Sequence, residues 1–208
     1  MLDGAQQPPK PGTDFSTFPR DTPEPGRGYY RAHHEKNSAW FFSGDRGRFD
    51  LGSEFGTSYW ADSPKTALRE RLRGAISDKN LLSPGFVKEL AISVSTLPPA
   101  LCANISHPDA SEFGVTVALS GGEVDYSMSQ TWAGELSSVG FDGVRYTARF
   151  TPGQSNSWAL FGDGGPHIPD GAEVSSTVLG NAAVKLAETF VEPVPALAEL
   201  AETTDPPV

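Results

Sequence analysis

The sequence lacks cysteine pairs, long apolar runs and any recognisable export segment. Its 208 residues include one cysteine, Cys102, so no disulfide can form within the chain, and a small buried side chain is its expected role. No apolar stretch approaches the roughly 20 residues that span a bilayer. The N-terminus lacks the basic and apolar parts of a signal peptide. We therefore expect a cytoplasmic protein with no membrane partner.

Basic residues are scarce in the second half of the chain. Residues 1–100 hold 13 Lys and Arg against 12 Asp and Glu, whereas residues 101–208 hold 3 against 14, which together make the net charge of −10. An acidic chain repels nucleic acid and anionic lipid, so we expect no direct nucleic-acid partner. The arginines of the first half remain available to bind a small anion.

Common motifs for nucleotides and metals are absent as well. No Gly-x-Gly-x-x-Gly stretch opens a helix after a strand, which argues against a Rossmann site, and no P-loop occurs. His-Glu-x-x-His does not occur, and the pair His33-His34 and the single His107 and His167 lack the spacing of metal ligands. We therefore predict no metal and no bound cofactor.

Six prolines lie within residues 1–27, with few apolar residues between them. This composition predicts an extended arm that is at least partly disordered in isolation. Residues 203–208 are expected to form a frayed tail. Between these ends, residues 28–202 show no internal repeat and no linker, so we predict a single domain there.

Strand and helix patterns mix irregularly along this domain, which is typical of the α+β class. The clearest helix follows Asp62 and Ser63, either of which can cap it, with Pro64 in its first turn. Two further helices are predicted, over 127–136 and 181–191. Strands are predicted at 29–33, 57–61, within 86–96, at 115–119, within 141–150 and at 158–161.

Four features could carry chemistry. They are Arg31 on the first strand, the turn Gly47-Arg48-Phe49-Asp50, Tyr59 on the second strand and Glu70 in the capped helix. Each also has a purely structural interpretation: an exposed arginine, an ordinary turn, a half-buried aromatic and a solvated glutamate. Pattern alone does not choose between the two interpretations.

Glu70 illustrates the choice. It lies about 160° around the helix from Leu68 and Leu72, by the roughly 100° per residue of an α-helix, so it faces away from the apolar stripe. It could pair with Arg73 one turn on, as a surface glutamate would. The small side chain of Ala67 on the same face instead leaves room for a ligand. The helix could therefore bury one face and present the other to a cleft.

The residue types of the four features suit a dinucleotide. Arginine forks bind diphosphate through two parallel hydrogen bonds and stay charged at physiological pH. A tyrosine ring stacks on nicotinamide or adenine. A carboxylate binds ribose hydroxyls and stabilises the positive charge that grows at the anomeric carbon when an N-glycosidic bond breaks. Nicotinamide leaves as a neutral base, so one acid, arginines and a hydroxyl are a chemically sufficient set.

The same motifs resemble the RES domain, a family named for an arginine, a glutamate and a serine. The resemblance covers most of residues 29–162 and rests on the order and spacing of short motifs rather than on any one of them. These motifs are Tyr30-Arg31-Ala32-His33, Gly47-Arg48-Phe49-Asp50, Tyr59-Trp60-Ala61-Asp62-Ser63, Ala67-Leu68-Arg69-Glu70, Gln130-Thr131-Trp132-Ala133, Phe141-Asp142-Gly143-Val144-Arg145-Tyr146 and Asn156-Ser157-Trp158-Ala159-Leu160-Phe161.

The resemblance implies a compact α+β domain similar to the ADP-ribosyltransferase fold. It implies a bacterial toxin that degrades NAD⁺ by phosphorolysis or hydrolysis, with NAD as substrate and phosphate as co-substrate in the first case. It also implies an antitoxin protein that covers the active site. An ADP-ribosyltransferase of the same fold and a degenerate module that binds NAD or a protein without turnover are the alternatives. The acceptor, the identity of the antitoxin and the formation of a homo-oligomer stay open.

The resemblance also implies roles for individual residues. Arg31 and Arg48 would hold the phosphates, with Arg31 counted among the catalytic residues as well. Tyr59 would pack on the nicotinamide side of NAD. Glu70 would be the catalytic carboxylate and would also contact the bound NAD.

The serine of the family departs from its expected place. It usually follows a Tyr-Pro or Val-Pro pair on a late strand, and the corresponding position here is Ala148. Thr147 is the predicted catalytic hydroxyl in its place, and Ser155 and Ser157 in the following segment are alternatives. We also predict that Ser157 contacts NAD. Reduced or lost activity is the remaining interpretation of Ala148.

Overall fold

An eight-stranded sheet forms the centre of the molecule, in a computed structural model that describes residues 6–44, 46–52, 54–72, 82, 84–121, 125–151, 153 and 155–188. The strand order is β1-β5-β6-β7-β3-β2-β4-β8, and every pair is antiparallel except the parallel pair β5–β6. The strands are β1 (Arg20–Asp21), β2 (Tyr29–His34), β3 (Phe55–Ala61), β4 (Leu90–Thr96), β5 (Cys102–Asn104), β6 (Gly143–Thr147), β7 (Asn156–Asp163) and β8 (Glu173–Leu179).

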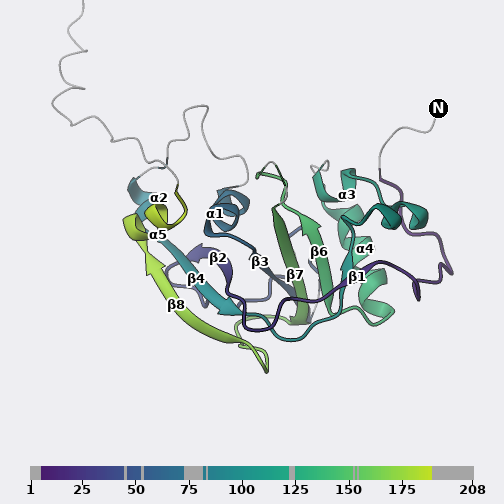
Figure 1. The fold of residues 1–208 in the computed structure, drawn as a ribbon, viewed down its shortest axis with the longest axis horizontal. Helices are drawn as coiled ribbons and strands as arrows, with labels where there is room; N and C mark the ends of the chain where they lie inside the picture. Colours follow the sequence, from purple (N-terminus) through teal and green to yellow (C-terminus); the bar gives the residue numbers. More distant parts are fainter. Residues whose placement is uncertain are drawn as a thin grey trace, which may run out of the picture.

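Two groups of helices pack against different parts of this sheet (Figure 1). The first group, α1, α2 and α5, lies beside β2, β4 and β8, whereas α4 packs on β6 with α3 next to it. The helices are α1 (Pro64–Leu72), α2 (Pro84–Lys88), α3 (Ala118–Gly121), α4 (Ser127–Ser138), α5 (Gly180–Leu186) and the 3-10 helix η1 (Pro108–Phe113). This mixture of a mostly antiparallel sheet with segregated helices confirms the predicted α+β class.

Three hydrophobic clusters fill the space between these layers. One lies where α4 and η1 meet β5, β6 and β7, and it contains the buried Trp132 and Leu136. A second is rich in aromatic rings, including Trp40, Trp60 and Trp158. The third lies under α1, α2 and α5. Each cluster packs against a different part of the sheet, so the sheet is supported along most of its width.

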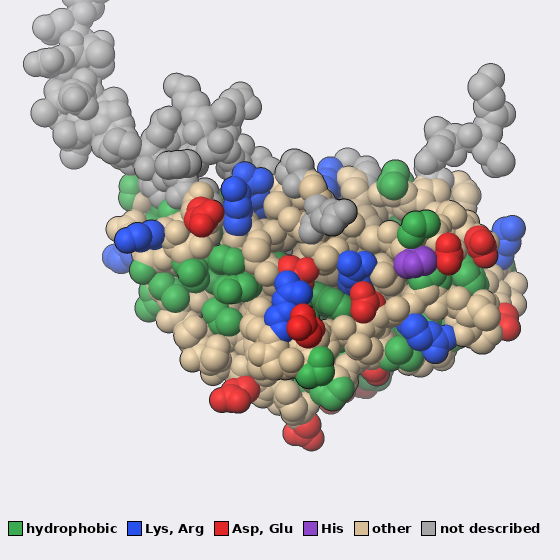
Figure 2. All heavy atoms as spheres, viewed as in Figure 1, with side chains coloured by type: hydrophobic (Ala, Val, Ile, Leu, Met, Phe, Trp, Pro, Cys, Tyr) green, Lys and Arg blue, Asp and Glu red, His purple; other side chains and the backbone are tan. Residues whose placement is uncertain are grey.

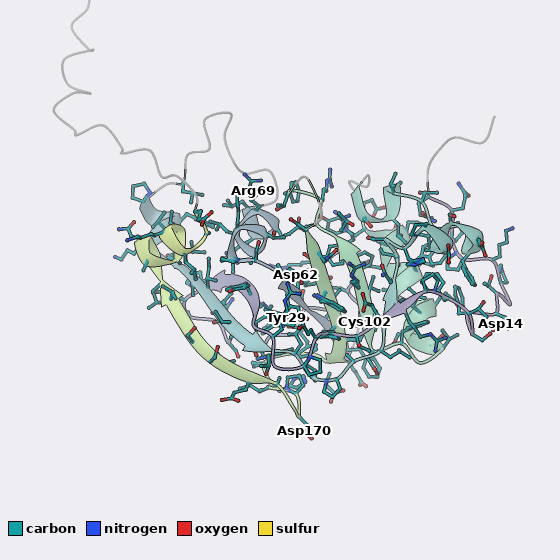
Figure 3. The ribbon with its side chains drawn as sticks, viewed as in Figure 1. Asp14, Tyr29, Asp62, Arg69, Cys102 and Asp170 are labelled. Atoms are coloured by element: carbon teal, nitrogen blue, oxygen red, sulfur yellow. The ribbon has the colours of Figure 1, made fainter. Side chains whose placement is uncertain are left out.

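Helix α1 begins as the sequence predicts. The Ser63 hydroxyl accepts a hydrogen bond from the Thr66 amide at 3.1 Å, so Ser63 is the capping residue. Asp62 instead accepts from the indole of Trp158 at 3.1 Å, and it lies in the middle of the molecule near Tyr29 (Figure 3). Leu68 and Leu72 are buried in the third cluster, as the apolar stripe requires. The helix is therefore fixed at its start and along one face.

The structure confirms most of the predicted elements and corrects one. The strands predicted at 29–33, 57–61 and 158–161 and the helix predicted at 127–136 form. The strand predicted at 115–119 does not form, because Gly114 has a φ of +89° and turns the chain, and the Gln6 side chain binds the Thr116 amide at 2.8 Å. Strand β8 was not predicted, because its Ser-Ser-Thr centre has no alternating apolar face.

The proline-rich arm packs onto the domain over its described part. Phe15 and Phe18 belong to the first hydrophobic cluster, and β1 pairs with β5 through Arg20 and Ala103. The edge of the core therefore does not coincide with the boundary predicted at residue 28, because two isolated aromatic residues carry enough apolar surface to dock an extended segment. The predicted tail at 203–208 lies outside the described residues.

Cys102 lies inside the sheet, among buried neighbours (Figure 3). Its side chain is fully buried, and this burial raises the pKa of the thiol well above the usual range. A neutral, inaccessible thiol is a poor nucleophile. The structure thus agrees with a packing role for this residue.

Candidate functional site

A cavity of about 460 Å³ lies where the two halves of the sheet meet. Strand β2 pairs along its full length with β4, and β3 pairs along its full length with β7, but β2 and β3 are joined through the single pair Tyr30 and Ala61. Both of these residues line the cavity, together with residues of α1 and of the loop before β3. The volume falls in the range of roughly 300–1,000 Å³ that small-molecule sites occupy.

Five predicted site residues come together on this cavity. They arrive from five segments that are distant in the sequence: β2, the 46–50 loop, β3, α1 and β7. The five are Arg31, Arg48, Tyr59, Glu70 and Ser157. Their convergence is a property of the fold, since the sequence alone showed only their order.

Arg31 bridges the two strands beside the cavity. Its Nη1 donates to the Ser58 hydroxyl at 2.5 Å, so a side chain of β2 reaches across to β3. Burial lowers the pKa of Arg31 to about 10, the hydroxyl of Tyr59 acts in the opposite direction, and the nearby Arg71 lowers the pKa further. The guanidinium remains charged at neutral pH, but it is poorly solvated and therefore suited to bind an anion.

The loop that carries Arg48 is organised by Asp50, whose side chain is buried. One carboxylate oxygen accepts from the Gly47 amide at 2.7 Å and the other from the Tyr59 hydroxyl at 2.6 Å. The Tyr59 hydroxyl in turn accepts from the Phe49 amide at 2.9 Å. Sequence reasoning quoted Asp50 within its motif and gave it no role, although a carboxylate close to a turn is a usual acceptor for turn amides.

Tyr59 therefore has its hydroxyl engaged inside the protein, while its ring lines the cavity. Burial raises the pKa of Tyr59 well above the usual range, and the neighbouring Asp50 raises it further. The hydroxyl stays protonated and donates to Asp50. The ring alone is available for the packing that the sequence predicts.

Two polar atoms beside the cavity are buried without a hydrogen-bond partner among the residues that the structure describes: Arg48 Nη1 and Ser157 Oγ. The Arg48 guanidinium also lies 5.5 Å from the centre of the Tyr126 ring, which lines the same cavity. Buried polar groups are nearly always hydrogen-bonded in native proteins, so this pair of atoms is available to a ligand or to ordered water in the cavity.

Glu70 is placed at the opposite side of α1 from the core, facing the cavity. Its Oε1 accepts a hydrogen bond from the Phe150 amide at 3.0 Å. Burial raises the pKa of the Glu70 carboxyl, and the Phe150 amide and the Arg48 charge act in the opposite direction. Glu70 is therefore a partly desolvated carboxylate and not a solvated surface glutamate. Arg73, which the sequence suggests as its partner, lies outside the described residues.

The cavity concentrates positive charge in an acidic protein. Arg46 and Arg71 line it in addition to Arg31 and Arg48, whereas Glu70 is the single carboxylate among the described residues of the lining. Sequence reasoning missed Arg46 and Arg71, although both are close neighbours of predicted residues in the chain. On the face shown in Figure 2, by contrast, basic and acidic side chains are intermixed. The positive cavity is therefore a local feature, and it suits a small polyanion.

The structure does not bring Thr147 to this cavity. Ser157 pairs with Tyr146 across β6 and β7, and both line the cavity, so the next residue of β6 points to the other face of the sheet. The Thr147 hydroxyl lies 3.0 Å from the Ser106 hydroxyl, in a second cavity that Ala148 also lines. Ser157 is thus the hydroxyl that the fold offers to the predicted site.

Within the described ranges, no three His, Cys, Asp or Glu side chains gather as metal ligands would. No helix in that part of the chain has both the length and the apolar character needed to cross a membrane.

Comparisons with known proteins show the family and the fold of this chain. The family model described as the RES domain matches residues 29–178. Among solved structures, the M. tuberculosis MbcT–MbcA toxin–antitoxin complex contains a chain with a TM-score of 0.62 and 17% sequence identity, over 81% of the present chain and 92% of that one. No curated protein matches the sequence.

Proposed function

This chain belongs to the RES-domain family, and from that premise we propose that it is an enzyme that cleaves the nicotinamide–ribose bond of NAD⁺. The observation that carries the proposal is the convergence of Arg31, Arg48, Glu70 and Ser157 on one cavity with two unsatisfied polar atoms. The site offers cations for a diphosphate and a carboxylate for a developing cation. A metal or a bound cofactor is not needed for this reaction.

We propose that the arginines bind the diphosphate of NAD⁺. Arg48 Nη1 is buried and lacks a partner among the described residues, and the Arg31 guanidinium is desolvated, so a phosphate oxygen would satisfy the first and compensate the second. Aromatic rings of Tyr59 and Tyr126 line the same space and offer faces for the two heterocyclic bases. Binding of the diphosphate would therefore give Arg48 Nη1 the acceptor that it lacks among the described residues.

Glu70 would act when the N-glycosidic bond breaks. The bonding electron pair goes to the nicotinamide nitrogen, which leaves neutral, and positive charge develops at the anomeric carbon. The Glu70 carboxylate, held by the Phe150 amide, stabilises this charge and contacts the ribose. A phosphate or water oxygen then forms the new bond to the anomeric carbon, and the proton of the attacking hydroxyl passes to solvent. The enzyme is a phosphorylase in the first case and a glycohydrolase in the second.

Ser157 replaces Thr147 in this proposal. Its hydroxyl is buried beside the cavity without a described partner, whereas the Thr147 hydroxyl is engaged with Ser106 elsewhere. Ser157 is well placed to bind a ribose or phosphate oxygen. Ala148 lines the second cavity, so the departure from the family pattern at that position carries no loss of function in this proposal.

We further propose that the chain is the toxin of a bacterial toxin–antitoxin pair and acts in the cytoplasm. The structural neighbour described above is part of a toxin–antitoxin complex, and the shared fold supports the same use here. The antitoxin protein would cover the arginine-lined cavity. Its presence would then block access of NAD⁺ without any change to the residues of the site.

The test is incubation of the purified chain with NAD⁺, with and without phosphate, followed by chromatographic separation of the products. Nicotinamide release is expected, with ADP-ribose as the co-product if water is the acceptor and its phosphate ester if phosphate is. Glu70→Gln should reduce release by about 100-fold or more, as loss of one electrostatic stabiliser does. Glu135→Gln, on the exposed face of α4, is the matched control and should have no effect.

Two outcomes would contradict the proposal. Transfer of labelled ADP-ribose to a protein target, without free product, would assign the chain as an ADP-ribosyltransferase. Tight binding of NAD⁺ in calorimetry without any product would assign it as a binding module.

A further inference from the structure

We propose that Asp50 is a positioning residue, which holds the Arg48 guanidinium toward the phosphates of the bound dinucleotide. The inference rests on the proposed function, because it deepens the account of that same site. Asp50 itself does not line the cavity, so it would act through the loop that it folds. Arg48 would bind the anion, and Asp50 would determine where Arg48 lies.

Asp50 is the acceptor for a set of four donors. Its Oδ2 accepts from the Ser43 hydroxyl at 2.7 Å and from the Arg46 and Gly47 amides at 3.0 and 2.7 Å. Its Oδ1 accepts from the Tyr59 hydroxyl at 2.6 Å. A buried carboxylate that accepts from this many donors fixes the conformation of the chain around it.

The loop is held from two further directions. The Gln130 side chain on α4 donates to the Gly47 carbonyl at 3.0 Å, and the Thr57 hydroxyl on β3 donates to the Phe49 carbonyl at 2.7 Å. The residues on both sides of Arg48 are thus tied to a helix and to a strand. Its backbone has little freedom, although its own Nη1 has no described partner.

Gly47 leaves no space for a side chain in this arrangement. A Cβ atom there would lie 2.3 Å from Asp50 Oδ1 and 2.3 Å from the Tyr59 hydroxyl oxygen. The carboxylate therefore approaches the backbone as closely as a glycine allows. This close approach explains why glycine stands immediately before the arginine in the Gly-Arg-Phe-Asp motif.

A side chain held by packing and by surrounding hydrogen bonds loses less entropy when it binds a ligand. Removing one of the tethers should therefore weaken anion binding more than it changes the chemical step. We expect Asp50→Asn, which presents an amide donor to a set of donors, to raise the KM for NAD⁺ by about tenfold and to change kcat by less than about threefold. Tyr59→Phe, which keeps the ring and removes one tether, should change KM in the same direction by a smaller factor.

A double-mutant cycle identifies the route of the effect. If Asp50 acts through Arg48, Asp50→Asn should weaken binding of ADP-ribose by less than about twofold when it is added to Arg48→Ala. Equal effects of Asp50→Asn with and without Arg48 would overturn the proposal. A purely structural aspartate serves as the control: Asp62→Asn, which loses acceptor contacts to Trp158 and Asn156, should lower the unfolding temperature and leave the KM unchanged.

Binding of inorganic pyrophosphate, measured by calorimetry, keeps this inference separate from the proposed function. If the wild-type chain binds pyrophosphate and Asp50→Asn and Tyr59→Phe both weaken that binding, the positioning role stands even where no nicotinamide is released. If nicotinamide is released and both variants keep the wild-type KM, the positioning role is wrong and the enzyme assignment stands. Should Asp50→Asn fail to fold, Tyr59→Phe decides alone, and an unchanged KM in it would overturn the proposal.

Discussion

Two of the cavities in the molecule lie on opposite sides of β6, and they differ in size and in chemistry. The first, of about 460 Å³, has four arginines and one glutamate among the described residues of its lining, and Arg48 Nη1 and Ser157 Oγ are buried beside it without described partners. The second, of about 670 Å³, is larger, and the described part of its lining mixes apolar residues with hydroxyl residues and includes the single arginine Arg149. Several of its polar groups are already paired, as the Ser106 and Thr147 hydroxyls are with each other.

The comparison shows that volume alone does not identify a binding site. Hydroxyls that are already paired within the protein offer a ligand few new hydrogen bonds, whereas a cluster of arginines and a buried atom without a described partner offer directed interactions. Two consecutive residues of one strand can also line different cavities. Tyr146 lines the first cavity and Thr147 lines the second, because successive side chains of β6 point to opposite faces.

The largest effect on binding is expected when a cation is removed from the first cavity. Arg31→Ala should lower the affinity for NAD⁺ by about 100-fold, because a desolvated charge–phosphate contact contributes about 3 kcal/mol. Isothermal calorimetry measures this directly. Arg145→Ala, which breaks the 3.3 Å ion pair with Asp21 away from both cavities, should leave the affinity for NAD⁺ unchanged. An equal loss of affinity in this variant would contradict the assignment of Arg31 to the binding site.

Removing one hydroxyl from each of the two cavities tests which cavity takes part in the reaction. Ser157→Ala should lower the rate of nicotinamide release by about tenfold, as loss of one hydrogen bond to a reacting substrate does. Thr147→Val should leave that rate unchanged and cost about 1 kcal/mol of unfolding free energy, through its lost bond to Ser106. Initial rates and urea unfolding of both variants provide the measurements, and a slower Thr147→Val enzyme would restore the original assignment.

The pH dependence of activity tests the carboxylate of the first cavity. Because burial raises the pKa of Glu70, the active carboxylate is lost as pH falls, beginning at a higher pH than for an ordinary glutamate. The acid limb of kcat/KM should therefore lie above the usual glutamate range. The same raised pKa means that wild-type stability, relative to Glu70→Gln, should increase as pH falls, and thermal unfolding across pH checks this sign.

The smallest effect is expected where the family pattern would place its serine. Ala148→Ser introduces a hydroxyl into the lining of the second cavity, away from the proposed chemistry. We expect the rate of nicotinamide release to change by less than about twofold, as for a substitution remote from the reacting atoms. A large gain in rate would mean that the end of β6 reaches the substrate after all.

Local signals predicted the elements on which the site is built. The cap at Ser63 and the apolar stripe of α1 identified the helix that carries Glu70, and aromatic and hydroxyl residues identified β3. Short or polar strands such as β5 and β8 were not predictable, because they form through pairing with neighbouring strands and carry no local pattern of their own.

The α+β fold class, the charge imbalance between the two halves of the chain and the residue types that suit a dinucleotide could all be read from the sequence. The tertiary structure decided which of those residues meet. The pairing of β6 with β7 places Ser157, and not Thr147, beside the first cavity. Asp50 is buried, and its carboxylate holds the loop that carries Arg48. Strand register and burial depend on contacts between segments distant in the chain, so a pattern of neighbours cannot contain them.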